Sequence, residues 1–204
     1  MPVDPQKIAA RTALILLGAG ASRRFGAQDK LGQPLWGRPL AHHALRAHSG
    51  LNWAEKILVC STPAEWHGAF SEAGFNILTN PTADGGMLSS LQLGAKGTGE
   101  VSHFCICLAD MPLIRPEHLL ALLTASGQHP DRIIATESTD YIGVPTILPR
   151  QAIDLLPQRG EGGARRLMSG ALGVPTPLED LSDIDTMRDL ERLETHQNAQ
   201  DSSL

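Results

Sequence analysis

Two features that nucleic-acid-binding proteins need are scarce in this 204-residue sequence: aromatic residues and an excess of positive charge. Phe, Trp and Tyr together make up only 4% of the chain, and its formal net charge at pH 7 is −5. A protein that binds DNA or RNA generally presents a basic face and often stacks aromatic rings on the bases. We therefore expect no nucleic acid among its partners, and a local cluster of basic residues suits a small anionic ligand instead.

Long apolar runs and a cysteine framework are also missing. The longest apolar runs have about five to seven residues, whereas a helix needs about 20 to cross a bilayer, and no secretory leader precedes the first expected strand. The three cysteines, Cys60, Cys105 and Cys107, lie in strand-like apolar runs. An odd number without framework spacing is typical of reduced thiols in a cytoplasmic core. We expect a cytoplasmic protein that does not bind a membrane.

Short apolar and β-branched runs alternate along the chain with helical patterns. Such runs are typical of strands covered on both faces, and we expect strands at Ala13–Leu17, Lys56–Ser61, Phe75–Leu78, Phe104–Leu108, Arg132–Thr136 and Thr146–Leu148. Helices are expected at Pro39–His48, Pro63–Ala73, Leu88–Ala95, Pro116–Ala125, Gln151–Leu156, Gly163–Met168 and Met187–Glu194. The alternation predicts an α/β fold, a single-domain three-layer sandwich with a Rossmann-like, mostly parallel sheet. We place the domain at residues 10–195, with mobile termini at 1–9 and 196–204.

The first expected strand ends in a glycine-rich, basic stretch, "LGAGASRRFGAQDK", from Leu17 to Lys30. A dinucleotide-binding fingerprint starting at Gly18 would need its third glycine where Arg23 stands, and the P-loop pattern also fails. Glycine-rich turns between a strand and a helix bring backbone amides against phosphate. Arg24 and Lys30 supply the cations that phosphate oxygens require. The stretch therefore predicts a phosphate site, the alternative being a solvated loop whose charges serve solubility.

This stretch resembles the motif of the molybdenum cofactor nucleotidyltransferases, L-A-[AG]-G-x-S-x-R-x-G-x(2,3)-K, at the end of their first strand. The matching residues are Leu17, Ala19, Gly20, Ser22, Arg24, Gly26 and Lys30. Gly18 departs from the pattern, because it stands where an alanine is usual. The following "LGQPLWGRPLAHHAL" is similar to the family's continuation into a helix. The resemblance implies a sheet of the nucleotidyltransferase type and a nucleotide pocket that includes Leu17, Gly18, Ala19, Gly20 and Ser22.

Two further stretches extend the resemblance. "NPTADGGMLSSLQLG" is similar to the family's G-x-x-x-S-L-x-x-G segment, which implies a nucleotide contact at Ser90. "CLADMPLI" is similar to its L-[AG]-D-x-P motif, which contains Asp110. Asp110 is also the first acid after a buried strand, at the edge where open α/β sheets bind ligands. A carboxylate facing nucleotide phosphates is a common way to hold Mg²⁺, although an aspartate in a turn has the same sequence pattern.

Three C-terminal stretches are similar to the family's acceptor side. "YIGVPTILPR" matches through Gly143 and Pro145, and "RGEGGARRLM" matches through Arg165, which the resemblance places near a second phosphate. A glycine-rich helix start with exposed arginines is the alternative for Arg165. "DIDTMRDLERL" is similar to the closing D-I-D-T-P-E-D-L, where Asp185 stands at the position of a second metal carboxylate. Asp185 or Thr186 could instead cap the last helix.

The resemblance implies transfer of a nucleoside monophosphate from a nucleoside triphosphate to a phosphorylated acceptor, with release of pyrophosphate. Arg24 would bind the leaving phosphates, Lys30 the α-phosphate, and Asp110 with Asp185 would hold Mg²⁺. Ala19 favours the branch that uses CTP and a molybdopterin-type acceptor, with a molybdoenzyme as client. A sugar- or polyol-phosphate nucleotidyltransferase is the alternative enzyme. A non-catalytic protein that binds and delivers a nucleotide or cofactor is the alternative from another class.

Overall fold

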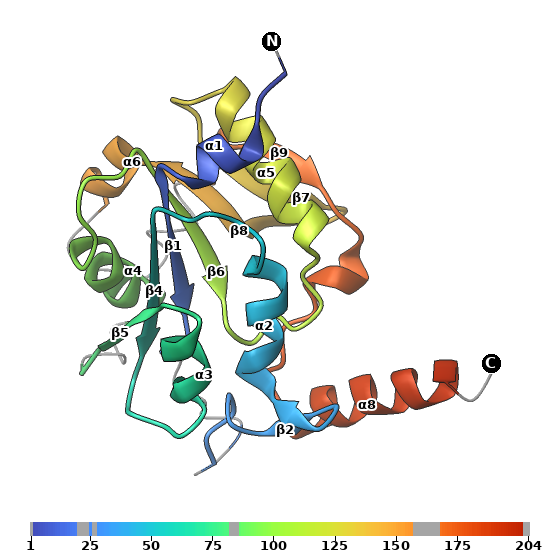
Figure 1. Ribbon diagram of the computed structural model, residues 1–204. Helices are drawn as coiled ribbons and strands as arrows, with labels where there is room; N and C mark the ends of the chain where they lie inside the picture. The colour runs from blue at the N-terminus through green and yellow to red at the C-terminus, as the bar shows by residue number, and fades with distance from the viewer. Residues whose placement is uncertain (1, 20–24, 26–27, 82–85, 157–167, 202–204) are drawn as a thin grey trace.

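The computed structural model describes residues 2–19, 25, 28–81, 86–156 and 168–201. Their centre is a seven-stranded sheet in the order β5-β4-β1-β6-β8-β7-β9. The strands, in that order, are Asn76–Thr79, Glu55–Cys60, Thr12–Leu17, His103–Leu108, Tyr141–Pro149, Ile134–Ser138 and Leu172–Pro175. β8 runs antiparallel to its neighbours β6 and β7, and the remaining pairs are parallel. The mostly parallel α/β sheet expected from the sequence is confirmed (Figure 1).

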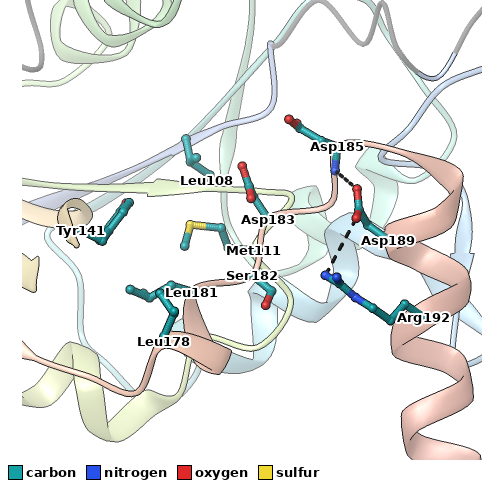
Figure 2. Close-up of a pocket in the computed structure, with 10 residues that line it drawn as sticks. All are labelled: Leu108, Met111, Tyr141, Leu178, Leu181, Ser182, Asp183, Asp185, Asp189 and Arg192. Carbon is teal, nitrogen blue, oxygen red and sulfur yellow. Dashed lines mark hydrogen bonds and ion pairs between the residues drawn. The ribbon is translucent and has the colours of Figure 1, made fainter. Parts of the chain in front are cut away.

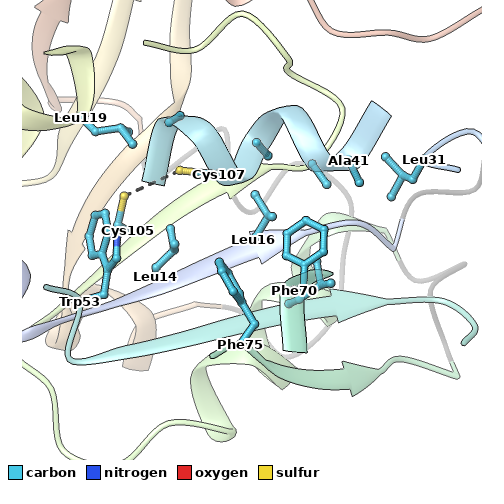
Figure 3. Close-up of a cluster of buried hydrophobic side chains, with 14 of the residues drawn as sticks. Leu14, Leu16, Leu31, Ala41, Trp53, Phe70, Phe75, Cys105, Cys107 and Leu119 are labelled. Carbon is cyan, nitrogen blue, oxygen red and sulfur yellow. Dashed lines mark hydrogen bonds between the residues drawn. The ribbon is translucent and has the colours of Figure 1, made fainter. Parts of the chain in front are cut away.

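Helices cover both faces of this sheet because alternate residues of the buried strands point to opposite sides. Leu14 and Leu16 of β1 belong to the core cluster beneath α2 (Leu40–His48) and α5 (Pro116–Gln128). Figure 3 shows this cluster, with α2 lying across the strands. Ala13 and Ile15 belong to a second cluster with residues of α4 (Met87–Lys96) and α6 (Arg150–Asp154). The two clusters make the three layers of the sandwich.

Three shorter helices and a terminal one complete the described fold. They are α1 (Pro5–Ala9), α3 (His67–Glu72), the 3₁₀ turn η3 (Leu178–Leu181) and α8 (Met187–Asp201), which leads away from the sandwich in Figure 1. A small antiparallel hairpin, β2 (Pro34–Leu35) with β3 (Arg38–Pro39), precedes α2. None of the helices that the structure describes is both long and apolar enough to span a membrane.

The N-terminus differs from our expectation that residues 1–9 lie outside the domain. Asp4 accepts a hydrogen bond from the backbone N–H of Gln6, and Pro5 occupies the first turn, so the segment has a capped helix start. α1 packs on α5, and Ile8 and Ala9 are buried in the core. At the other end, α8 continues to Asp201 and not to Glu194.

Other element boundaries also differ from expectation. α3 begins at His67, four residues later than the start proposed at Pro63, and β9 and the β2–β3 hairpin were not expected. β8 begins at Tyr141 and not at Thr146. Its pairing with β7 shifts register between Ala135 and Thr136 and then continues to Tyr141. That irregularity accommodates Pro145, which has no N–H to give to a regular ladder. The helix expected at Gly163–Met168 lies outside the described residues except for its last position.

Candidate functional site

The carboxyl ends of β1 and β6 lie side by side, and the chain leaves both strands at the same edge of the sheet. Gly18 donates its N–H to Val59 O at 2.8 Å, and Ala109 donates to Leu17 O at 3.0 Å, so the ladder extends one residue past each strand. An open α/β sheet binds its ligands at this edge, next to the point where the strand order reverses. Gly18 therefore lies beside Ala109, the residue before Asp110.

The departure at Gly18 has a steric reason. A Cβ atom built at Gly18 would lie 2.9 Å from Leu31 Cδ1, 3.5 Å from Val59 O and 3.7 Å from Ala109 Cβ. Leu31 is buried and follows Lys30 directly. The missing side chain at Gly18 thus lets the turn that carries Lys30 pack closely on the end of β1.

Lys30 lies between the two predicted metal carboxylates. Its Nζ is 2.5 Å from Asp110 Oδ2 and 3.8 Å from Asp185 Oδ1. The side chain of Lys30 is 10% exposed, whereas that of Asp185 is 46% exposed. The ammonium is therefore held inward by Asp110, and Asp185 faces solvent on its outer side. One cation and two acids from three distant segments form a charged centre at the edge of the sheet.

Two interactions hold the segment of Asp185 against the end of β6. Ile184 donates its N–H to the carbonyl oxygen of Asp110 at 3.0 Å. Arg115, just before α5, makes a forked pair with Asp180, with both nitrogen–oxygen distances at 2.9 Å. Asp180 is only 5% exposed, so its charge is compensated within the protein. Bidentate pairs of this kind fix geometry as well as charge.

The start of α8 shows whether Asp185 or Thr186 caps this helix, a question that the sequence left open. Asp189 Oδ2 accepts hydrogen bonds from the N–H and the hydroxyl of Thr186, at 2.8 and 2.7 Å. The N–H of Asp189 in turn donates to Thr186 Oγ1 at 3.3 Å. This reciprocal arrangement is a capping box with Thr186 as the cap. The side chain of Asp185 is turned toward Lys30 instead.

A third acid, Asp183, belongs to the same cluster and was missed by the sequence analysis. Burial raises the pKa of its carboxyl above the usual value, and the charges of Asp185 and Asp110 raise it further, while Lys30 opposes them. The available signal was the spacing of Asp183 and Asp185, which places both side chains on one side of an extended segment. Three acids against one lysine leave an excess of negative charge, which favours a bound cation.

A cavity of about 400 Å³ opens beside these acids. Figure 2 shows Asp183 and Asp185 at one end and Tyr141 with apolar side chains at the other. The full lining is Leu108, Met111, Tyr141, Leu178, Leu181, Ser182, Asp183, Asp185, Asp189 and Arg192. The cavity is therefore apolar at one end and charged at the other, where Asp183 and Asp185 lie.

Two of the predicted acceptor residues, Gly143 and Pro145, belong to β8 and are not among the described residues that line this cavity. Pro145 is buried, and its carbonyl accepts the hydroxyl of Thr136 at 2.6 Å. A Cβ atom at Gly143 would lie 2.8 Å from the hydroxyl oxygen of Tyr141, whose own hydrogen bond goes to Val144 O. Gly143 thus leaves room for the ring of Tyr141, which is the residue of β8 that reaches the cavity.

The predicted nucleotide contacts are partly internal. Ser90 is 1% exposed and accepts a hydrogen bond from Asn80 Nδ2 at 2.9 Å, a contact that joins the end of β5 to α4. Leu17 and Ala19 are each 7% exposed and belong to the core cluster under α4. Gly20, Ser22, Arg24 and Arg165 lie outside the described residues. Their assignments stay predictions.

The described residues suit a hard divalent cation that takes most of its ligands from outside the protein. Asp110 Oδ1 is buried without a hydrogen-bonding partner, although its carboxylate is 2.5 Å from Lys30 through the other oxygen. Within the described ranges, no group of three or more His, Cys, Asp or Glu side chains is arranged to hold a metal. Mg²⁺ typically takes one or two carboxylates and completes its shell with phosphate oxygens and water. Asp110 and Asp185 therefore fit Mg²⁺, and they do not form a site in which the protein supplies all the ligands.

Comparison with known proteins identifies the family. The family described as MobA-like NTP transferase domain matches residues 14–176, which include Lys30 and Asp110 and end before Asp185. A probable molybdenum cofactor guanylyltransferase of Pyrococcus furiosus is 31% identical over 107 residues, which are 51% of this chain and 50% of that protein. The match thus spans about half the length of that relative.

Solved structures show the same fold at lower identity. A nucleotidyl transferase from Methanothermobacter superposes with a TM-score of 0.76 at 19% identity, covering 91% of this chain and 97% of that one. The 4-diphosphocytidyl-2C-methyl-D-erythritol synthase of Anaerococcus prevotii superposes with a TM-score of 0.72 at 12% identity, covering 96% and 100%. These likenesses confirm the single-domain α/β architecture.

Proposed function

This chain belongs to the MobA-like NTP transferase family, and from that membership we propose that it transfers a nucleoside monophosphate to a phosphorylated acceptor. The observation that carries the proposal is the position of Lys30, held between Asp110 and Asp185 at the ligand-binding edge of the sheet. A buried ammonium placed among acids suits chemistry in which negative charge develops on phosphate. A solvated loop lysine would have no such surroundings.

The reaction needs positioning and charge compensation, and no covalent intermediate. An oxygen of the acceptor phosphate attacks the α-phosphorus of the triphosphate, the bond from that phosphorus to the bridging oxygen breaks, and pyrophosphate leaves. Lys30 would contact the α-phosphate and compensate the charge that grows on it. Arg24, by its place in the family motif, would bind the leaving phosphates. Backbone amides at Gly18–Ser22 would line the nucleotide pocket.

Asp110 and Asp185 are the residues that would hold Mg²⁺. The buried, unpartnered Oδ1 of Asp110 supports this part of the proposal. When bound there, Mg²⁺ would neutralise part of the negative charge of the nucleotide phosphates. The excess of negative charge from Asp183 would assist its retention.

The cavity beside the acids supports an acceptor that carries a flat ring. Leu108, Met111 and Leu181 with Tyr141 form a mostly apolar wall, on which a heterocycle can pack. A sugar or polyol phosphate would instead need hydrogen-bonding side chains around its hydroxyls, and the lining supplies these mostly at its charged end, at Ser182, Asp183, Asp185, Asp189 and Arg192. We therefore propose a molybdopterin-type acceptor, with the polyol phosphate as the runner-up, and a molybdoenzyme as the client. Three free, buried cysteines agree with a cytoplasmic setting for this activity.

We propose CTP as the preferred nucleotide because Ala19 stands where guanylyl-transferring relatives carry a second glycine. One methyl group in a pocket wall changes affinity by about 1–3 kcal/mol, and Ala19, which is 7% exposed and belongs to the core cluster under α4, presents only part of its methyl group to a ligand. The Pyrococcus furiosus relative is named a guanylyltransferase, so GTP is the competing substrate.

The experiment is to measure pyrophosphate release with each nucleoside triphosphate, with Mg²⁺, and with molybdopterin, a polyol phosphate or no acceptor. We expect release with CTP that exceeds release with GTP and that requires molybdopterin. Release with GTP alone would overturn the choice of nucleotide, and release with the polyol phosphate alone would overturn the acceptor. Tight nucleotide binding without pyrophosphate release under any condition would instead favour the delivery protein.

A further inference from the structure

The turn that carries Lys30 is attached to the core through the residue before it. Asp29 Oδ1 accepts the N–H of Leu31 at 3.1 Å, which closes the turn around Lys30. Asp29 Oδ2 accepts the indole N–H of Trp66 at 2.7 Å. The Asp29 carboxylate thus connects the backbone of Leu31, just after Lys30, to the indole of Trp66, which lies 37 positions after Asp29 in the sequence.

Trp66 is a firm attachment point because its own position is determined on several sides. It is 7% exposed, and its ring packs edge-on against His67 and Phe70, with centroids 4.2 and 5.6 Å away. His42 of α2 donates a ring N–H to the carbonyl oxygen of Trp66 at 2.9 Å. A ring held in this way loses little further freedom when it binds Asp29.

Gly32 gives an independent indication that the approach of Asp29 and Trp66 matters to the turn. A Cβ atom at this position would lie 3.2 Å from Asp29 Oδ2 and 3.3 Å from Trp66 Cδ1. The residue two positions after Lys30 therefore has no side chain where the carboxylate and the indole meet. The turn is shaped around this pair.

We propose that Trp66 and Asp29 are positioning residues for Lys30: their hydrogen bond fixes the turn that holds the Lys30 ammonium against Asp110. Lys30 has a long, flexible side chain, and fixing its backbone removes part of the freedom that it would otherwise lose on reaching the reacting phosphate. The catalytic consequence rests on the proposed function. The structural consequence, protection of the Lys30 amine, does not.

The chain offers a matched control for the test. Trp66→Phe removes the indole N–H and keeps an aromatic ring, and Trp53→Phe makes the same change at a second buried tryptophan of the same core cluster. The indole of Trp53 donates instead to His48 O at 3.3 Å, at the end of α2 and not on the turn of Lys30. A general loss of packing would affect both variants, whereas loss of positioning would affect Trp66→Phe alone.

The first readout is the rate at which acetic anhydride acetylates Lys30, measured by peptide mass spectrometry with exposed Lys96 as the internal reference. We expect Trp66→Phe and Asp29→Asn to raise this rate about fivefold, because the ammonium leaves Asp110 more often. Trp53→Phe should leave it unchanged. Equal rates in Trp66→Phe and Trp53→Phe would overturn the positioning role, whether or not the protein is a transferase.

The second readout is turnover with the preferred nucleotide. Trp66→Phe should lower kcat about five- to tenfold with little change in the nucleotide KM, the effect of weakening one charge-assisted hydrogen bond. In a Lys30→Met background the same substitution should cost nothing more, because it acts through Lys30. An undiminished loss in that background would show that Trp66 acts by packing alone and would overturn the proposal. A wild-type protein without turnover would contradict the proposed function and leave the acetylation result to decide the positioning.

Discussion

Lys30 Nζ lies 2.5 Å from Asp110 Oδ2, although 80 positions separate the two residues in the sequence. Lys30 follows the glycine-rich end of β1 and Asp110 follows β6, and the two strands are parallel neighbours. The pair therefore depends on the topology of the sheet. It also places Lys30, which is 8% exposed, at the edge of the sheet where open α/β folds bind ligands.

Lys30→Met should lower kcat on the order of 10²-fold or more, while nucleotide affinity changes little. A cation that acts mainly on charge developing in the transition state affects kcat more than ground-state binding. Steady-state kinetics and calorimetric binding of the nucleotide separate the two effects. Lys96→Met, at an exposed lysine of α4, is the control and should behave as wild type. A normal kcat in Lys30→Met would show that the buried lysine has no part in turnover.

Asp185→Asn should raise the Mg²⁺ concentration needed for half-maximal turnover and leave the melting temperature nearly unchanged. Asn offers a neutral carbonyl, which binds Mg²⁺ more weakly than a carboxylate. Thr186→Ala should show the opposite pattern, because it removes the cap of α8 at a cost of about 1 kcal/mol. Activity titrated with Mg²⁺ and thermal melts of both variants distinguish the roles. Identical metal dependence in Asp185→Asn and wild type would remove Asp185 from the metal site.

Asp183→Asn should raise the melting temperature at neutral pH by about 2 °C. Burial and the neighbouring acids raise the pKa of Asp183, so the folded state binds its proton more tightly than the unfolded chain. This acid therefore costs stability above its raised pKa, and the cost disappears as pH falls toward the ordinary value of 3.8. Melts of wild type and variant across this range should converge at low pH. A gap that is constant with pH would indicate a cause other than charge.

Unfolding stability should fall between pH 6.5 and pH 4 partly because of His48. Burial lowers the pKa of His48 from 6.5 to about 4, so the unfolded chain binds this proton and the folded protein does not. The difference of about 2.5 pH units corresponds to about 3 kcal/mol, because 2.5 × 1.36 ≈ 3. Urea titrations at several pH values measure the slope. His48→Leu should show a shallower loss, and an unchanged slope would mean that His48 does not contribute to acid sensitivity.

The sheet and its ligand-binding edge were predictable because both follow from periodicity. Strands buried on two faces are continuous apolar runs, and the first acid after such a run, Asp110, marks the end of the strand. The first half of β8 was not predictable in the same way, because Gly143 and Pro145 argue against a strand unless an irregularity in pairing is known. The hairpin at Trp36 and Gly37 was missed because tryptophan rarely takes the positive φ of 50° found there.

The site was predictable only where one residue of a motif carries the chemistry. Lys30 and Asp110 could be selected from motifs at the ends of strands, but their direct ion pair was not expected. Local sequence patterns did not predict the positions of Asp183 and Tyr141 or the Trp66–Asp29 hydrogen bond. These depend on how segments that are distant in the sequence pack together. Thr186 caps α8, because Asp189, three residues later, completes a capping box with it.

Transfer of the α-phosphoryl group itself tests the proposed activity most directly. Wild type and Lys30→Met would be incubated with Mg²⁺, molybdopterin and CTP or GTP labelled at the α-phosphorus. We expect the label to appear in a molybdopterin dinucleotide, one for each pyrophosphate released, faster from CTP than from GTP and about 10²-fold more slowly with Lys30→Met. Label that stays in the triphosphate, or that reaches the product equally fast in both proteins, would contradict a transferase centred on Lys30 and Asp110.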